Sequence, residues 1–269
     1  MKNIIIATSD LHIGHTTIDD VLEMTREIEE LVCHEGLRGL ALLVLGDIGE
    51  SLKDIEMTLA VLGDLAPVKV FVPGNHDLFD TERMGSSLHR YREHLPSLAT
   101  RHGYVWGIQD RPIIIDDIAI VTTTAWPRSE TIIGLADLDP REVQAARDEL
   151  PDGRWITRDL RDDAVSDEQL HLFMQALAAV PRDVRKAIVA THYPVLLEQN
   201  SKPVSAYTPW FISPRFGNSL LQWKNERPNI VVEVVSGHLH EHVDVTTDGV
   251  RARVIDSGYR RPGYVVVEV

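Results

Sequence analysis

The chain opens with the stretch Ile4-Ile5-Ile6-Ala7-Thr8-Ser9-Asp10-Leu11-His12, in which an apolar run ends in an aspartate and a histidine two positions apart. Four further apolar runs end at similar polar segments, and continuous short apolar runs indicate buried strands. Together the segments offer oxygen and nitrogen ligands for two metal ions and one further histidine for proton transfer. The five segments are Asp10-Leu11-His12, Gly46-Asp47, Gly74-Asn75-His76-Asp77, Thr191-His192-Tyr193-Pro194 and Gly237-His238-Leu239-His240.

Helical patterns separate the first three of these apolar runs. We expect strands over residues 4–7, 40–45 and 68–72, with amphipathic helices over 17–34 and 52–64. Strands that alternate with helices in this way favour an α/β fold with a parallel sheet.

The rest of the chain predicts further strands and helices around two irregular segments. The last four strands are predicted to form an antiparallel meander, because Asp248-Gly249 is typical of a hairpin turn. We expect a single domain over residues 1–269, with excursions at about 126–165 and 200–218. The further helices are expected over 80–102 and 167–180, and the further strands over 104–108, 112–115, 118–123, 186–190, 230–236, 241–247, 250–256 and 263–268.

The composition limits the classes of partner and the location. The formal net charge of −14 repels a phosphate polymer, so a nucleic-acid partner is disfavoured. The single cysteine, Cys33, excludes an intrachain disulfide and fits a reducing compartment. No apolar stretch approaches the roughly 18 residues of a membrane span, and the N-terminal run is too short for a signal peptide. We therefore expect a cytoplasmic protein without a membrane segment.

The proposed ligands suit the hydrolysis of a phosphate ester. Two metal ions roughly 3.5–4 Å apart can activate a nucleophile and stabilise the attacking and leaving oxygens. Because two cations repel each other, the site needs a bridging anion, and the Asp47 carboxylate or a hydroxide can serve. Such a pocket would keep a positive charge and attract an anionic ester into an acidic protein.

The spacing of the ligands also fits this reading. Asp10 and His12 are two residues apart just after a strand, so their side chains can point to the same side, and His238 and His240 repeat the arrangement. Mixed oxygen and imidazole ligands suit two divalent or trivalent ions of Mn, Fe, Zn, Co or Ni rather than Ca. Glycine allows tight turns and close backbone approach. The glycines that precede proposed ligands are Gly46, Gly74 and Gly237.

The five segments, in this order, resemble the motif set of the calcineurin-like metallophosphoesterases, which reads D-x-H, G-D, G-N-H-(D/E), H and G-H-x-H. The resemblance covers roughly residues 4–256. It implies a four-layer α/β/β/α sandwich of two mixed β-sheets flanked by helices. It also implies that His76 protonates the leaving group or stabilises the transition state, with Asp47 and Asn75 as further catalytic residues. The implied ligands are Asp10, His12, Asp47 and His240 for one metal, and Asp47, Asn75, His192 and His238 for the other.

The segment that follows Asp47 bears on the substrate. Ser/Thr protein phosphatases of this superfamily carry G-D-x-V-D-R-G and G-N-H-E, whereas this chain reads Gly46-Asp47-Ile48-Gly49-Glu50-Ser51-Leu52 and ends its third segment in Asp77. The arginine that would bind a monoester dianion is missing, so we favour a small phosphodiester or phosphoanhydride substrate. A phosphomonoesterase and a non-catalytic metal-binding interaction module remain alternatives, and a homo-oligomer formed through residues 200–218 stays open.

Several other residues are weaker candidates for a role in the site. Asp77 is expected to support the ligands by hydrogen bonds rather than to bind a metal. His15 could face the substrate, although a solvated loop position is favoured. Four arginines could contact a phosphate but are favoured as solvated: Arg128, Arg215, Arg260 and Arg261. Four aromatic residues either line a lid over the site or pack locally: Trp126, Tyr207, Trp210 and Phe211.

Overall fold

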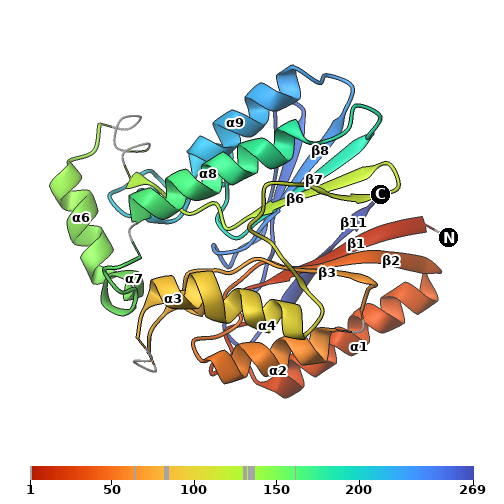
Figure 1. Cartoon of the computed structure of the whole chain (residues 1–269), viewed down its shortest axis with the longest axis horizontal. Helices are drawn as coiled ribbons and strands as arrows, with labels where there is room; N and C mark the ends of the chain where they lie inside the picture. Colours follow the sequence, from red (N-terminus) through yellow and green to blue (C-terminus); the bar gives the residue numbers. More distant parts are fainter. Residues whose placement is uncertain (1, 64, 82–84, 130–131, 133–136, 161) are drawn as a thin grey trace.

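Two β-sheets lie at the centre of the molecule, and helices cover both of their outer faces (Figure 1). The computed structural model describes residues 2–63, 65–81, 85–129, 132, 137–160 and 162–269. The strands are β1 (Lys2–Ser9), β2 (Leu37–Val44), β3 (Val68–Phe71), β4 (Val105–Trp106), β5 (Ile113–Ile115), β6 (Ile118–Thr123), β7 (Lys186–Thr191), β8 (Val231–Ser236), β9 (Val243–Thr247), β10 (Val250–Val254) and β11 (Gly263–Glu268).

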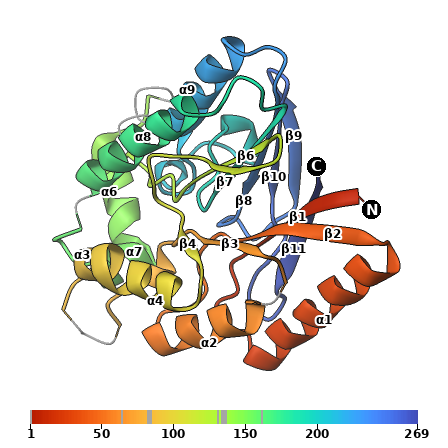
Figure 2. The ribbon, with the colours of Figure 1, turned by 45° about the vertical axis from the view of Figure 1, so that its right-hand side comes forward.

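The helices fall into two groups in the views (Figures 1 and 2), with α1, α2 and α4 beside the first sheet and α8 and α9 beside the second. The α-helices are α1 (Ile18–His34), α2 (Leu52–Leu62), α3 (Ser87–His89), α4 (Leu95–Arg101), α6 (Pro140–Glu149), α7 (Pro151–Trp155), α8 (Asp162–Ala178) and α9 (Pro214–Asn225). Short 3-10 helices are η1 (His76–Leu78), η3 (Leu197–Gln199) and η4 (Thr208–Trp210), and η2 (Arg90–His94) is a π-helix. Among the described residues, no helix is long and apolar enough to cross a membrane.

Both sheets are mixed. The first has the order β11-β1-β2-β3-β4, in which β1 to β4 are parallel and β11 is antiparallel to β1. The second has the order β5-β6-β7-β8-β10-β9, in which the four inner strands are parallel and both edge strands are antiparallel. The predicted α/β/β/α sandwich of two mixed sheets is therefore confirmed.

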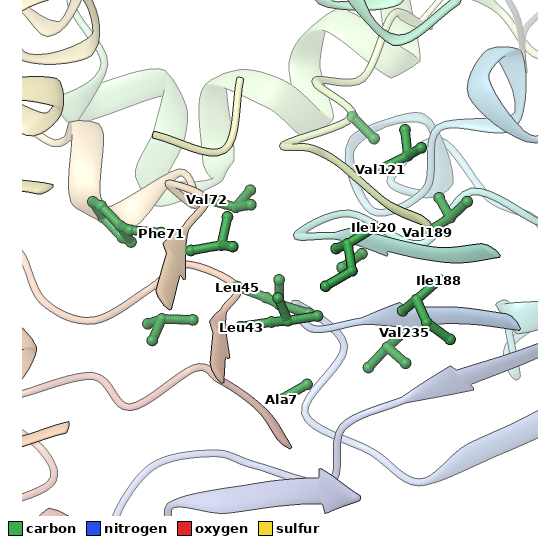
Figure 3. Close-up of a cluster of buried hydrophobic side chains, with 14 of the residues drawn as sticks. Ala7, Leu43, Leu45, Phe71, Val72, Ile120, Val121, Ile188, Val189 and Val235 are labelled. Carbon is green, nitrogen blue, oxygen red and sulfur yellow. The ribbon is translucent and has the colours of Figure 1, made fainter. Parts of the chain in front are cut away.

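The core lies where the two sheets face each other (Figure 3). Leu43 from the first sheet and Ile188 and Val235 from the second have no solvent exposure. Burial of one such side chain contributes roughly 1.5–3 kcal/mol, so the strands are held firmly against each other. The polar segments that follow these strands are therefore anchored on a rigid base.

The first helix begins where the sequence places it. Thr17 caps α1: its side chain accepts a hydrogen bond from the backbone of Asp20, and the Asp20 carboxylate accepts one from the backbone of Thr17. This reciprocal capping box satisfies N–H groups that the first helical turn leaves without partners. The predicted helix over 17–34 thus differs from the observed one by a single residue.

The predicted antiparallel meander at the C-terminal end is wrong. Asp248 and Gly249 do turn the β9–β10 hairpin, both with positive φ. However, β10 inserts between β9 and β8 and runs parallel to β8, and β11 joins the other sheet beside β1. A strand pattern in the sequence identifies a strand but not the strand that it pairs with. The prediction assumed that consecutive strands pair with each other, and this assumption fails for β10 and β11.

Other predicted bounds also need correction. The helix expected over 80–102 is a succession of α3, η2 and α4 that begins at Ser87, and the strand expected over 104–108 is reduced to the two residues of β4. The loop expected over 200–218 contains η4 and the start of α9. Parts of the predicted elements lie outside the described residues, namely 64, 82–84, 130–131, 133–136 and 161.

Besides the start of α8, the described residues of the segment over 126–165 include α6 and α7, which the sequence did not predict. In Figure 1 they lie to one side of the two sheets. Asp139 caps α6 by accepting a hydrogen bond from the backbone of Arg141, and a proline begins each helix. Proline is favoured at the first helical position because its missing N–H has no partner there in any case. That these residues belong to a single domain stays a prediction.

Candidate metal centre

The five polar segments come together at the carboxyl ends of strands from both sheets. Asp10 follows β1 and Asp47 follows β2, while His192 follows β7 and His238 follows β8. Asn75 follows β3 in the first sheet. Ligand sites of α/β proteins form at this edge because loops from several strands converge there.

The first group of side chains consists of Asp10, His12, Asp47 and His240, whose ligand atoms all lie within 4.8 Å of one another. The two histidine Nε2 atoms are 3.0 Å apart, and His240 Nε2 lies 3.3 Å from Asp10 Oδ1. His12 Nε2 lies 3.8 Å from Asp47 Oδ2. These atoms point at one small volume from three sides.

The second group shares Asp47 with the first and adds His192 and His238. His192 Nε2 lies 3.6 Å from Asp47 Oδ2 and 3.1 Å from Asn75 Oδ1. Asp47 therefore lies between the two groups, as a carboxylate that bridges two ions must.

The chemistry of these groups fits metal ions. Both ring nitrogens of His238 are buried and have no hydrogen-bond partner among the described residues. A buried polar group without a partner costs about 1–3 kcal/mol, and the ring of a ligand histidine is one explanation for it. Burial also lowers the pKa of His238 to about 3 and that of His12 to about 4, which keeps both rings neutral as metal ligands must be.

The backbone is left-handed at five of the proposed ligands. Asp10, His12, Asp47, His238 and His240 have φ values of 55°, 42°, 53°, 74° and 55°. Residues other than glycine seldom adopt this conformation, and it occurs preferentially where a functional site requires it. The left-handed backbone turns Asp10 and His12 toward the first group, and it turns His238 toward the second group and His240 toward the first.

Two glycines allow this close convergence. A Cβ atom on Gly74 would collide with the Asp47 carboxylate, and one on Gly237 would collide with Ser9 and Asp10. The third glycine, Gly46, has a φ of +86°. The need for glycine before the ligands therefore has a steric basis at all three positions.

Hydrogen bonds from behind the ligands fix their orientation. His192 Nδ1 donates to the carbonyl of Leu45 at 2.8 Å, which leaves Nε2 free for a metal. The Asp10 carboxylate accepts from the backbone N–H of His238 at 2.9 Å. Asp77 accepts from the backbone of Asp47 at 2.9 Å and from that of Gly74 at 2.8 Å, so it supports the ligand loops as expected.

His76 lies beside the metal centre with a carboxylate partner that sequence reasoning missed. Its Nδ1 atom is 3.5 Å from Glu50 Oε1, and its backbone N–H donates to Asp47 Oδ1 at 2.9 Å. Burial alone would lower the pKa of His76, but the carboxylates of Asp47 and Glu50 together raise it to about 9. The position of Glu50, three residues after a ligand, was the signal available in the sequence.

A cavity of about 260 Å³ opens above these residues. Its walls come from the metal centre, from the α7 region and from the segment around η4. Trp210 and Phe211 line it, whereas Tyr207 and Trp126 do not. The lining residues are Asp47, Asn75, His76, Leu150, Pro151, Asp152, Trp210, Phe211, His238, Leu239, His240 and Tyr259.

Tyr259 is a second residue that sequence reasoning missed. Its ring is half exposed and lies 4.8 Å from that of His12, 4.6 Å from that of His15 and 5.3 Å from that of His240, measured between ring centroids. His15 is thus at the rim and does not line the cavity. Tyr259 lies in the turn after β10, far in sequence from every motif except the last.

The candidate arginines do not reach the cavity. Arg128 and Arg215 both donate to Asp167, and Arg261 donates to Asp256. No lysine or arginine is found among the described residues that line the cavity. A larger cavity of about 600 Å³ lies beside it and shares Asp152 and Trp210, but the metal-ligand groups lie in the smaller one.

Comparison with known proteins agrees with this geometry. The family model of the calcineurin-like phosphoesterases matches residues 4–242, and the chain belongs to this family. The family hydrolyses phosphoesters with two metal ions, and the side chains described above are groups that could hold them. No curated protein sequence matches the chain significantly.

Solved structures share the fold. A phosphopantetheinyl hydrolase (PptH) from Mycobacterium tuberculosis is similar with a TM-score of 0.75 and 22% identity, over 97% of this chain and 91% of that one. A protein of Staphylococcus aureus described as a candidate 5'-nucleotidase has a TM-score of 0.55 and 14% identity, over 100% of this chain and 51% of that one. GAP50, the anchor in the inner membrane complex of Plasmodium, has a TM-score of 0.53 and 9% identity, over 98% and 80%.

Proposed function

We propose that this chain is a metal-dependent phosphodiesterase that acts on a small phosphodiester or phosphoanhydride. The observation that carries the proposal is the convergence of two ligand groups on a shared carboxylate, Asp47, beneath a cavity of about 260 Å³. Proposed ligands of one ion are Asp10, His12, Asp47 and His240, and those of the other are Asp47, Asn75, His192 and His238. The ions themselves are proposed to be Mn, Fe, Zn, Co or Ni, and the location cytoplasmic.

Each side chain has a defined task in this proposal. When bound, two such ions supply Lewis acidity to the phosphoryl oxygens and lower the pKa of water so that it attacks at neutral pH. In the metal-free chain the carboxylates of Asp47 and Glu50 raise the pKa of His76 to about 9, which favours a protonated ring. Glu50 faces Nδ1, so Nε2 is the ring atom that remains to donate a proton to the departing alcohol.

The charge of the cavity wall favours a diester over a monoester. A monoester is a dianion near neutral pH and needs more cationic contacts than a diester, which carries a single negative charge. The lining residues that the structure describes include no lysine or arginine. The apolar part of the wall, with Trp210, Phe211 and Tyr259, instead offers contact to an uncharged second ester group.

The test compares bis-p-nitrophenyl phosphate with p-nitrophenyl phosphate. Metal-stripped protein would be supplied in turn with Mn²⁺, Co²⁺, Ni²⁺, Zn²⁺ or Mg²⁺, and kcat/KM measured for both esters. We expect faster hydrolysis of the diester and a loss of about 10²–10⁴-fold in the His76→Ala variant, which is the range of general acid catalysis. A phosphopantetheinyl ester belongs in the same panel, because a protein of the same fold is a phosphopantetheinyl hydrolase.

The other outcomes separate the alternatives. Faster hydrolysis of the monoester would reject the diester proposal but keep the metal-dependent mechanism. Two bound ions without hydrolysis of any ester in the panel would favour the non-catalytic interaction module. Unchanged activity of His76→Ala would reject the proton-transfer role of His76.

A further inference from the structure

Asn75 is the one amide among the proposed metal ligands, and an amide can present either its oxygen or its nitrogen to a cation. Only the oxygen can act as a ligand, because the NH₂ group has no electron pair to offer. The two orientations have nearly the same shape, so steric packing cannot choose between them. Some hydrogen-bond partner must therefore select the orientation that turns the oxygen toward the metal.

Asp152, at the second position of α7, is that partner. The Nδ2 atom of Asn75 donates to Asp152 Oδ1 at 2.7 Å, and the Asn75 Oδ1 atom then lies 3.1 Å from His192 Nε2 in the second ligand group. A carboxylate only accepts hydrogen bonds, so the reversed amide would place its oxygen against a negative charge. Asp152 belongs to the 126–165 segment, which contributes none of the motifs.

Asp152 is itself held in place. It is 7% exposed, and its Oδ2 atom lies 3.4 Å from Arg147 Nη1. Arg147 also donates to Asp162 at 2.9 Å, and its guanidinium lies 4.9 Å from the ring centroid of Trp210. The carboxylate thus sits in a network that fixes its direction, and the arginine offsets part of the cost of burying its charge.

We propose that Asp152 is a positioning residue for Asn75 and thereby sets the affinity of the second metal ion. The proposal rests on the assignment of Asn75 as a ligand under the proposed function. It assigns a role in metal binding to α7 that acts through Asn75, although the sequence of this helix carries no metal-binding pattern. A role confined to anchoring α7 through Arg147 would make different predictions, because it would not depend on Asn75.

A double-mutant cycle on metal binding tests this proposal without measuring hydrolysis. The binding of Mn²⁺ to metal-stripped protein would be measured by titration calorimetry for the wild type, Asp152→Ala, Asn75→Ala and the double variant. We expect Asp152→Ala to weaken the second ion about 10–100-fold, the usual effect of removing such a supporting group, and to leave the first ion unchanged. In the Asn75→Ala background the same change should have no further effect, because the amide that it orients is gone.

Two controls accompany the cycle. Asp152→Asn keeps an acceptor oxygen for Asn75 and should bind the second ion within a few-fold of the wild type. Asp148→Ala removes an exposed carboxylate from the neighbouring helix α6, whose hydrogen bond goes to Gln144 rather than to Asn75, and should change neither ion. If Asp152→Ala does not fold, Asp152→Ser provides a side chain that is polar but too short to reach the amide, with the same expected loss.

The failures of the two proposals are distinguishable. Additive effects of Asp152→Ala and Asn75→Ala, or equal weakening of both ions by Asp152→Ala, would overturn the positioning role and leave the proposed function intact. If Asp152→Ala binds both ions as the wild type does, while Asn75→Ala loses the second ion, the positioning role of Asp152 would also be overturned and the proposed function would stand. Normal binding of both ions by Asn75→Ala would remove Asn75 from the ligands and overturn the positioning role, while the hydrolysis assay would still decide the proposed function.

Discussion

The Nε2 atoms of His12 and His240 lie 3.0 Å apart, although 228 positions separate the two residues in sequence. Two nitrogens at this distance need a proton or a cation between them. Burial lowers the pKa of His12 to about 4. Burial also opposes protonation of His240, but its hydrogen bond to Asp10 raises its pKa above the ordinary value. These shifts favour a proton on His240 in the metal-free protein, and a metal ion that takes its Nε2 atom must displace that proton.

Replacing His238 with leucine should preserve or raise the stability of the metal-free protein but weaken its binding of metal. In the metal-free protein, His238→Leu removes two buried nitrogens without partners and adds apolar contact. We expect the free energy of unfolding to stay the same or to rise by about 1–2 kcal/mol. The stabilisation that Mn²⁺ adds should decrease, because the second ion loses a ligand. Urea unfolding with and without metal measures both effects.

His15→Leu is the matched control, since His15 is an exposed histidine near the same cavity. It should leave the stabilisation by Mn²⁺ unchanged. A large loss of metal-free stability in His238→Leu, together with an undiminished response to Mn²⁺, would show that His238 is a structural residue.

The metal-free protein should lose stability between pH 6.5 and pH 9. The pKa of His76 is about 9 in the folded chain against 6.5 in the unfolded chain, so the native state binds more protons in this window. The stabilisation by this group is complete below pH 6.5 and disappears as the pH rises through 9. We expect a contribution on the order of 3 kcal/mol, since one pKa unit corresponds to about 1.4 kcal/mol and the pKa rises from 6.5 to about 9.

Urea unfolding of the chelator-treated protein at both pH values provides the measurement, with His76→Gln as comparison. The variant should lose less stability than the wild type over the same window. Equal losses in the two proteins would mean that His76 does not titrate as described.

Gly237→Ala should disrupt the metal centre through sterics alone. The added methyl group would overlap Ser9 and the Asp10 carboxylate, both of which are buried and fixed. We expect a loss of about 3 kcal/mol or more in stability, at the upper end of overpacking effects, and weaker binding of the first metal ion. Thermal unfolding and Mn²⁺ titration would measure the two losses.

Gly249→Ala offers the comparison, because a methyl group there meets no atom within 4 Å and only the positive φ of +74° opposes it. It should cost about 1 kcal/mol and leave metal binding unchanged. Similar losses in the two variants would mean that the crowding at Gly237 is relieved by small shifts of its neighbours.

The convergence of most candidate-site residues could be predicted from the sequence, because the proposed ligands lie next to strands. Asp10, Asp47 and His192 each follow an apolar run, and the carboxyl ends of parallel strands share one edge, so the pattern alone indicates that these side chains lie close together. Asp152 and Tyr259 could not be found in this way. They come from a polar helix and an irregular turn, and their positions depend on tertiary packing that local patterns do not encode.

The pairing of the C-terminal strands could not be predicted from the sequence either, because it also depends on tertiary packing. Both β10 and β11 have clear strand patterns, yet one joins the second sheet and the other crosses to the first. Which edge a strand joins depends on the free edges left by the rest of the fold. The hairpin at Asp248-Gly249 is local, and it was predicted correctly.

The wide spread of the ligands along the chain has a consequence for biosynthesis. The first group joins Asp10 to His240, so the nascent polypeptide must leave the ribosome beyond the last of these residues before the site can close. A chain that stops earlier exposes acidic and imidazole side chains but cannot surround an ion with them. Metal loading would therefore follow the synthesis of residues 10–240 and the docking of both sheets, and retained metal in a purified sample would report the integrity of this part of the polypeptide.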